Sequence, residues 1–152
     1  MTKNVNQIAK AMKELCGNNE AKIRHFVSVY TLAKTIGELE KLPEQTQEYL
    51  EISALVCDID DSDSDFKKHE LVKDMLQKQE LEFDIIDRVC YIVENFDNFD
   101  HITGLDHQIL LEAHMIVDFK EKGVDRQTII KESNSKFMTN YGRAFLKKAF
   151  SV

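Results

Sequence analysis

The sequence predicts an all-α protein, and three observations carry that prediction. The 152 residues include only one proline and five glycines, so few positions favour turns or interrupt a helix. Apolar residues recur at intervals of three and four along most of the chain, which is the spacing of one helix face. The sequence contains neither an internal repeat nor a low-complexity stretch. Because 43% of the residues are hydrophobic, a chain of this length predicts one compact domain, residues 1–152.

The amino-terminal half divides at its glycine and proline residues. An amphipathic helix is expected within residues 1–18, packing on the rest of the domain, with Gly17 suited to its carboxyl-terminal cap. A second helix is expected over residues 20–41, because Pro43 marks a helix end. A third, over residues 44–59, is apolar around most of its circumference and is therefore predicted to be central and buried. The apolar face predicted for the second helix is formed by Ile23, Phe26, Val27, Tyr30, Ala33 and Gly37.

The carboxyl-terminal half begins with an acidic run from Asp58 to Asp65. Its like charges and short polar side chains favour a loop. A second polar loop is expected over residues 97–104, and Gly123 marks a helix end. The remaining expected helices are amphipathic and pass through residues 71–76, 83–96, 105–122 and 137–150.

The charge of the chain excludes one class of partner. A net charge of -7 argues against binding to a nucleic-acid backbone, because neutralising phosphates needs clustered lysine and arginine. No apolar run approaches the length that spans a bilayer, and residues 1–7 lack the apolar stretch of a secretory signal. We therefore expect a cytoplasmic protein that binds no membrane. The three widely spaced cysteines fit neither a disulfide framework nor a zinc ribbon.

Three segments place metal-ligating residue types on different expected helices. His25 follows Ile23 and Arg24 near the start of the second helix, Cys57 and Asp58 end the third, and His114 lies in the helix over 105–122. In order and spacing these segments resemble the HD superfamily of metal-dependent phosphohydrolases, and small bacterial HD hydrolases in particular. The resemblance extends over most of the chain, through residues 87–93, 104–113 and 139–143.

The resemblance implies an HD-type helical bundle with a divalent metal at its centre. In that family a lone His, a His-Asp pair ending a buried helix and a distant Asp bind the metal. His25 and Asp58 keep the family's residue types, whereas Cys57 replaces the His of the pair and His114 replaces the distant Asp. Residues 94–96 stand where many such relatives carry tandem His for a second metal.

Two interpretations of this altered motif follow from the chemistry of its residues. In the first, His25, Cys57, Asp58 and His114 bind one zinc, manganese or iron ion, since imidazole, thiolate and carboxylate are all ligands for such metals. In the second, no metal binds: the two histidines are core residues, Cys57 is a small buried apolar residue, and Asp58 caps a neighbouring helix.

The two interpretations predict different functions. With a metal, the protein hydrolyses a phosphorylated small molecule or a nucleotide; Asp58 is then the catalytic residue, holding the metal and accepting a proton from its water. Lys67 or Lys68, just after the acidic run, would meet the substrate phosphate. Without a metal, the protein is a catalytically inactive HD-like scaffold that binds a small ligand or a protein partner.

Overall fold

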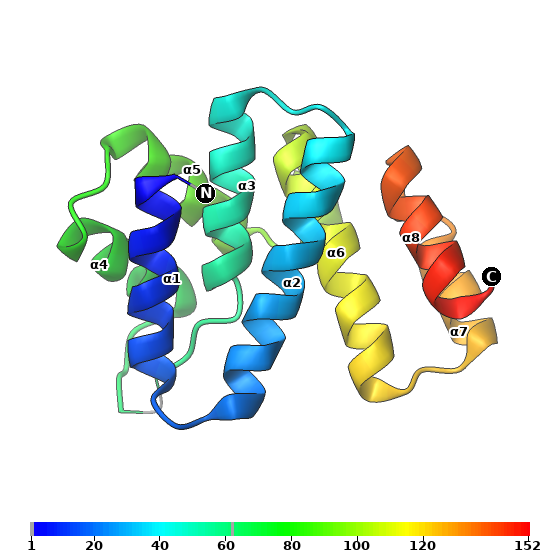
Figure 1. Ribbon diagram of the computed structural model, residues 1–152, viewed down its shortest axis with the longest axis horizontal. Coiled ribbons are helices and arrows are strands. Elements are labelled where there is room, and N and C mark those ends of the chain that lie inside the picture. The colour runs from blue at the N-terminus through cyan, green and yellow to red at the C-terminus, as the bar shows by residue number, and fades with distance from the viewer. Residues whose placement is uncertain (1, 62) are drawn as a thin grey trace.

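The computed structural model describes residues 2–61 and 63–152, and within these residues every regular element is helical (Figure 1). The prediction of an all-α protein is therefore confirmed. The short 3₁₀ helix η1 spans Phe99–His101. The α-helices are α1 (Lys3–Cys16), α2 (Glu20–Leu39), α3 (Glu44–Val56), α4 (Lys68–Lys78), α5 (Phe83–Glu94), α6 (Gly104–Lys122), α7 (Arg126–Ser133) and α8 (Asn140–Phe150).

Local side-chain chemistry sets several helix ends. In four helices the residue before the first turn accepts a hydrogen bond from a free backbone N–H: Thr2 in α1, Asn19 in α2, Asp125 in α7 and Thr139 in α8. Gly17 and Gly123 follow α1 and α6 with φ of +56° and +60°, which a residue without a Cβ adopts readily.

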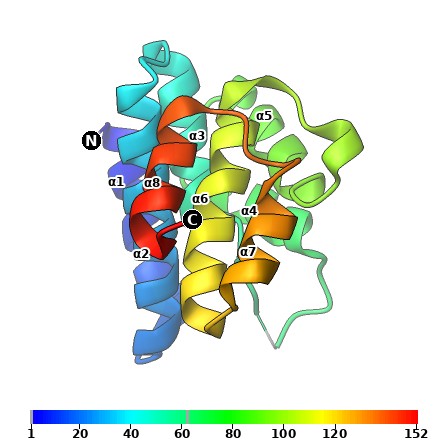
Figure 2. The same ribbon diagram turned by 90° about the vertical axis from the view of Figure 1, so that its right-hand side faces the viewer.

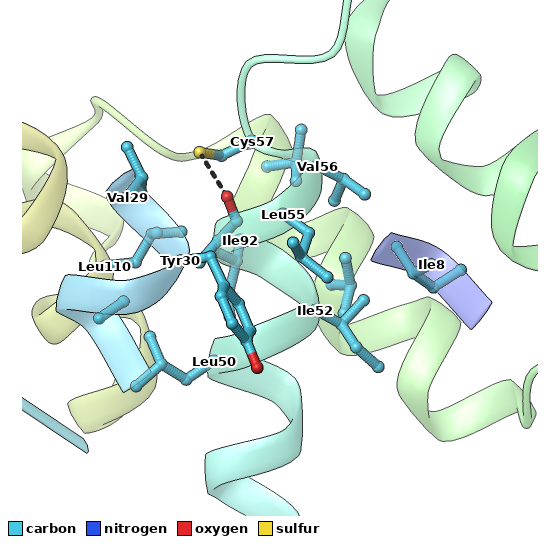
Figure 3. Packing of buried hydrophobic residues seen from close by; sticks show 14 of the residues in the cluster. Ile8, Val29, Tyr30, Leu50, Ile52, Leu55, Val56, Cys57, Ile92 and Leu110 are labelled. Atoms are coloured by element: carbon cyan, nitrogen blue, oxygen red, sulfur yellow. Dashed lines mark hydrogen bonds between the residues drawn. The ribbon is translucent and has the colours of Figure 1, made fainter. Parts of the chain in front are cut away.

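Helix α3 is the centre of the bundle. It contacts α1, α2, α5 and α6, and its residues from Leu50 to Val56 are all buried. Figure 3 shows side chains from several helices converging around it. The prediction that this helix is central and buried is confirmed, because a helix with neighbours on every side needs apolar residues on every side.

The other helices form two flanks. Helices α1, α2, α3 and α6 lie side by side, with α4 and α5 against α1 and α3 on one flank (Figure 1). Helices α7 and α8 cover the other flank, where α8 packs on α6 and α2 (Figure 2). A second, smaller apolar cluster fills that flank: Ile116, Phe119, Ile129, Phe137 and Leu146.

One buried carboxylate fastens α8 to α6. Glu112 of α6 is fully buried and accepts hydrogen bonds from the backbone N–H groups of Met138 and Thr139, at 3.0 and 3.1 Å. It also accepts from the Thr139 hydroxyl and the Gln108 amide, both at 2.6 Å. Gly142 leaves room for this carboxylate, since a Cβ there would overlap Glu112 Oε1.

Several boundaries and one apolar face differ from the predictions. Helix α2 ends at Leu39 because Lys41 adopts a left-handed φ of +59°. Helix α3 ends at Val56, before a turn in which the Ile59 N–H donates to the Val56 carbonyl. The prediction that Val27 lies on the buried face of α2 was wrong: its side chain is 39% exposed, and Val29 and Ile36 are buried instead.

The helices of the carboxyl-terminal flank also differ from the predicted ones. Helix α7 was not predicted, because its eight residues contain only a short apolar pair, Ile129 and Ile130. Helix α8 begins at Asn140 rather than at Phe137, since Thr139 caps it. The acidic run forms an irregular loop as predicted, apart from Ser62, which lies outside the described residues. Among the described residues, no helix combines the length and apolar character needed to cross a bilayer.

Candidate functional site

The structure brings His25, Asp58 and His114 together from three helices. Asp58 lies two residues past the end of α3, where the chain turns toward α2 and α6. Its Oδ2 atom is 2.5 Å from His25 Nε2, on α2, and 2.7 Å from His114 Nε2, on α6. Because α2, α3 and α6 contact one another in the core, the packing of the bundle fixes the spacing of the three groups.

Two more carboxylates hold the outer nitrogens of these histidines. Glu121 Oε2 is 2.9 Å from His25 Nδ1, and Asp118 Oδ2 is 3.3 Å from His114 Nδ1. His114, Asp118 and Glu121 are spaced by four and three residues and therefore lie on one face of α6. Five side chains form an alternating series of carboxylates and imidazoles, here named the Asp58 cluster: Glu121, His25, Asp58, His114 and Asp118.

The cluster favours the charged forms of His25 and Asp58. Burial alone would lower the pKa of His25, but hydrogen bonds with Asp58 and Glu121 outweigh it and raise that pKa above its ordinary value. Burial alone would raise the pKa of Asp58, but the hydrogen bonds and charges of His114 and His25 hold it well below its usual range. Asp58 is therefore an ionised carboxylate between two imidazoles.

Cys57 faces the core more than the cluster. Its side chain is 1% exposed, and its Sγ donates to the Ala54 carbonyl at 3.6 Å (Figure 3). The same sulfur lies 3.7 Å from Asp58 Oδ2. Burial, reinforced by the Asp58 charge, raises the pKa of the thiol well above its ordinary value, so the sulfur is a neutral thiol rather than a thiolate.

Among the residues that the structure describes, two groups of side chains have the spacing to hold a metal ion. One consists of His25, His114 and Asp118, and the other of Cys57, Asp58 and His114; within each, the ligand atoms lie within 4.8 Å of one another. The four predicted ligands are thus divided between two groups that share His114. Imidazole and carboxylate donors suit zinc, manganese and iron, and Glu121 on the outer nitrogen of His25 matches the way proteins orient metal-binding histidines. The donors present therefore fit a divalent transition metal.

Of the two predicted phosphate-binding lysines, Lys68 lies at the site. Its Nζ is 4.0 Å from Asp58 Oδ1. Lys67 is the exposed residue that precedes α4, one position earlier. The start of α4 therefore directs one of the two ammonium groups toward the cluster.

Two hollows meet at Asp58 and Lys68, which border both. The first has a volume of about 540 Å³ and lies beside His25, with Cys16, Lys22, Phe26 and Glu121 in its wall. The second has a volume of about 500 Å³ and lies beside His114, with Phe96, Phe99, Asp118, Lys122 and Lys136 in its wall. Both hollows are large enough to admit a small organic ligand to the cluster.

The sequence analysis did not identify Asp118, Glu121 or the wall of the second hollow. Their spacing from His114 places Asp118 and Glu121 on the same face of one helix, but the contact of Glu121 with His25 depends on the fold. The wall residues on η1 and α7 come from separate segments whose proximity depends on the fold.

The chain matches no protein-family model, no curated protein and no solved structure. The resemblance to the HD superfamily therefore depends on the residues quoted above.

Proposed function

We propose that the protein is an HD-type metal-dependent phosphohydrolase that acts on a small phosphorylated molecule. The observation that supports this proposal most is the position of Asp58. An ionised carboxylate lies between two imidazoles from other helices, at the boundary of two hollows, with a lysine ammonium 4.0 Å away. Such a set joins metal ligands to a cationic group that can bind phosphate.

His25, Asp58 and His114 would hold the metal, which would take ligands from both groups, and Asp118 offers a further carboxylate in the group of His25 and His114. A divalent ion bound there would polarise a phosphate oxygen and lower the pKa of a bound water. Glu121 would fix the ring orientation of His25 through its Nδ1. Cys57, buried beside Asp58 and His114, would offer its sulfur as a further ligand, because a bound metal ion favours the thiolate.

Asp58 and Lys68 would supply proton transfer and phosphate binding. Phosphoryl transfer depends mainly on positioning and on stabilising charge. Lys68 would pair its ammonium with a phosphate oxygen at the border of the two hollows. Asp58 Oδ1, 4.0 Å from that ammonium, would accept a proton from the attacking water while Oδ2 serves as the metal ligand.

A second candidate is a catalytically inactive scaffold that binds a small ligand or a protein partner. One observation favours it: the two imidazoles already satisfy Asp58 Oδ2, and each imidazole has a carboxylate on its other nitrogen. Every imidazole nitrogen of the cluster therefore lies within 3.3 Å of a carboxylate oxygen without an ion.

Metal analysis separates the two candidates. Untagged protein purified without chelator is analysed by elemental mass spectrometry, together with Asp58→Ala and His114→Ala. Asp60→Asn serves as the matched control, because Asp60 is an exposed neighbouring carboxylate bound to Lys22 and belongs to neither ligand group.

We expect close to one transition-metal ion per chain in the wild type and in Asp60→Asn, and loss of it in the other two variants. Hydrolysis of p-nitrophenyl phosphate should follow the metal content. Wild-type protein that stays metal-free after incubation with zinc, manganese and iron(II) would exclude the hydrolase and leave the scaffold.

A further inference from the structure

The second hollow has an aromatic wall that begins at the Asp58 cluster. The ring of Phe96 meets the His114 ring edge to face, with 4.7 Å between centroids and 77° between planes. Phe99 and Phe119 line the same hollow. The volume of about 500 Å³ lies in the range of pockets that hold small organic ligands and leaves room for much more than a phosphate group.

Phe99 lies at the rim of this hollow. It belongs to η1, between α5 and α6, and is 45% exposed although it is a large apolar side chain. Lys136, from the segment between α7 and α8, holds its Nζ 4.4 Å from the centre of the Phe99 ring. This cation–π contact helps to position a ring that keeps much of its surface in solvent.

Three lysines line this hollow. Lys68 lies beside Asp58, Lys122 is paired with Asp118 at 3.6 Å, and Lys136 lies over the Phe99 ring. The first hollow is different: its wall contains one phenylalanine, the buried Phe26, and its Lys22 is paired with Asp60 at 2.5 Å. Of the two hollows, the second therefore suits a ligand with an anionic end and a flat apolar end.

We propose that the second hollow binds the leaving-group half of the substrate and that this half is a planar aromatic ring, so that the substrate is a phosphate ester carrying such a ring. The inference rests on the proposed function, because that function places the phosphate at Asp58 and Lys68. The ring stacks on Phe99, and the phosphate end faces Lys68. Both nucleoside monophosphates and simple aryl phosphates have this chemistry.

Binding is measured on chelator-treated protein, so that no turnover interferes. Isothermal titration calorimetry compares adenosine 5′-monophosphate and phenyl phosphate with ribose 5-phosphate, which has the phosphate but no aromatic ring. A base stacked on an aromatic side chain predicts that adenosine 5′-monophosphate binds about tenfold more tightly than ribose 5-phosphate. Phenyl phosphate sharing this preference would indicate an aryl ester, and phenyl phosphate without it would indicate a nucleotide.

Three variants locate the ring. Phe99→Leu keeps an apolar side chain but removes the ring, and should abolish the preference over ribose 5-phosphate. Phe99→Tyr keeps the ring and should retain it. Phe83→Leu is the matched control, because Phe83 is 77% exposed at the start of α5 and lies outside the wall of the hollow. Circular dichroism of each variant shows that the fold is intact.

Equal affinities for adenosine 5′-monophosphate, phenyl phosphate and ribose 5-phosphate would overturn the proposal, as would an unchanged preference in Phe99→Leu. Failure of the proposed function has a different signature, namely no bound metal and no turnover. Since the titration uses metal-free protein, a ring preference lost in Phe99→Leu would support the aromatic subsite whatever the metal analysis shows.

Discussion

Replacing Glu112 by alanine tests the link between α6 and α8. The carboxylate is fully buried and accepts from two backbone N–H groups, one hydroxyl and one amide. Alanine removes all four acceptor contacts together. The Thr139 N–H is buried and would have no acceptor, whereas Met138 and Gln108 are partly exposed and can turn to water.

The magnitude follows from these contacts. A buried donor without a partner costs about 1–3 kcal/mol, and here two donors, the N–H and the hydroxyl of Thr139, are buried and two are partly so. Relief of the cost of burying a carboxylate offsets part of this loss. We expect Glu112→Ala to lower the free energy of unfolding by about 3 kcal/mol, which for a domain of this size corresponds to a fall in Tm of about 6–12 °C.

Glu112→Gln is the matched control. Its carbonyl oxygen can take the place of Oε2, which accepts from Gln108, Met138 and Thr139. Its amide then faces the Thr139 hydroxyl in place of Oε1, so we expect a loss of only about 1 kcal/mol.

Urea unfolding followed by far-UV circular dichroism measures both variants. Equal losses in the two variants, or a loss below about 1 kcal/mol for alanine, would refute the argument that the buried donors carry the effect.

Three further predictions concern other parts of the molecule. Gly37→Ala should destabilise the protein by about 1–3 kcal/mol in urea unfolding, because the new Cβ would lie 2.7 Å from Leu50 Cδ2 between α2 and α3; a stabilised variant would contradict this close approach. In chelator-treated protein, the stability that His25 contributes should be fully present below its unfolded pKa of about 6.5 and should be lost as pH rises through its raised folded pKa. The free energy of unfolding in urea should therefore differ less between wild type and His25→Gln as pH rises. A difference that grows with pH would contradict the raised pKa of His25. Cys57 should resist iodoacetamide in the native state and react after unfolding, as measured by peptide mass spectrometry. The partly exposed Cys16 should react in both states. Labelling of Cys57 in the native state would contradict its burial in the core.

The central helix could be anticipated from its apolar pattern, and the meeting of His25, Asp58 and His114 from the resemblance to the HD superfamily. Apolar residues around the circumference of α3 indicate its burial, and Asp58 lies two residues past its end. Asp118 and Glu121 were missed because exposed acidic residues are common on helices, and only the fold shows which of them face a histidine. The rim residue Phe99 lies in an expected polar loop, where local periodicity gives no information.

The burial of Cys57 makes positions 57 and 114, where the sequence departs from the HD pattern that it resembles, structurally unequal. His114 lies against the second hollow, so a side chain of another size can be accommodated there with little disturbance of the bundle. Position 57 is closed by the core, and an imidazole, larger than a thiol, would force its neighbours apart unless one of them became smaller. A single substitution can therefore change the residue at position 114, whereas a larger residue at position 57 needs a paired change in the core.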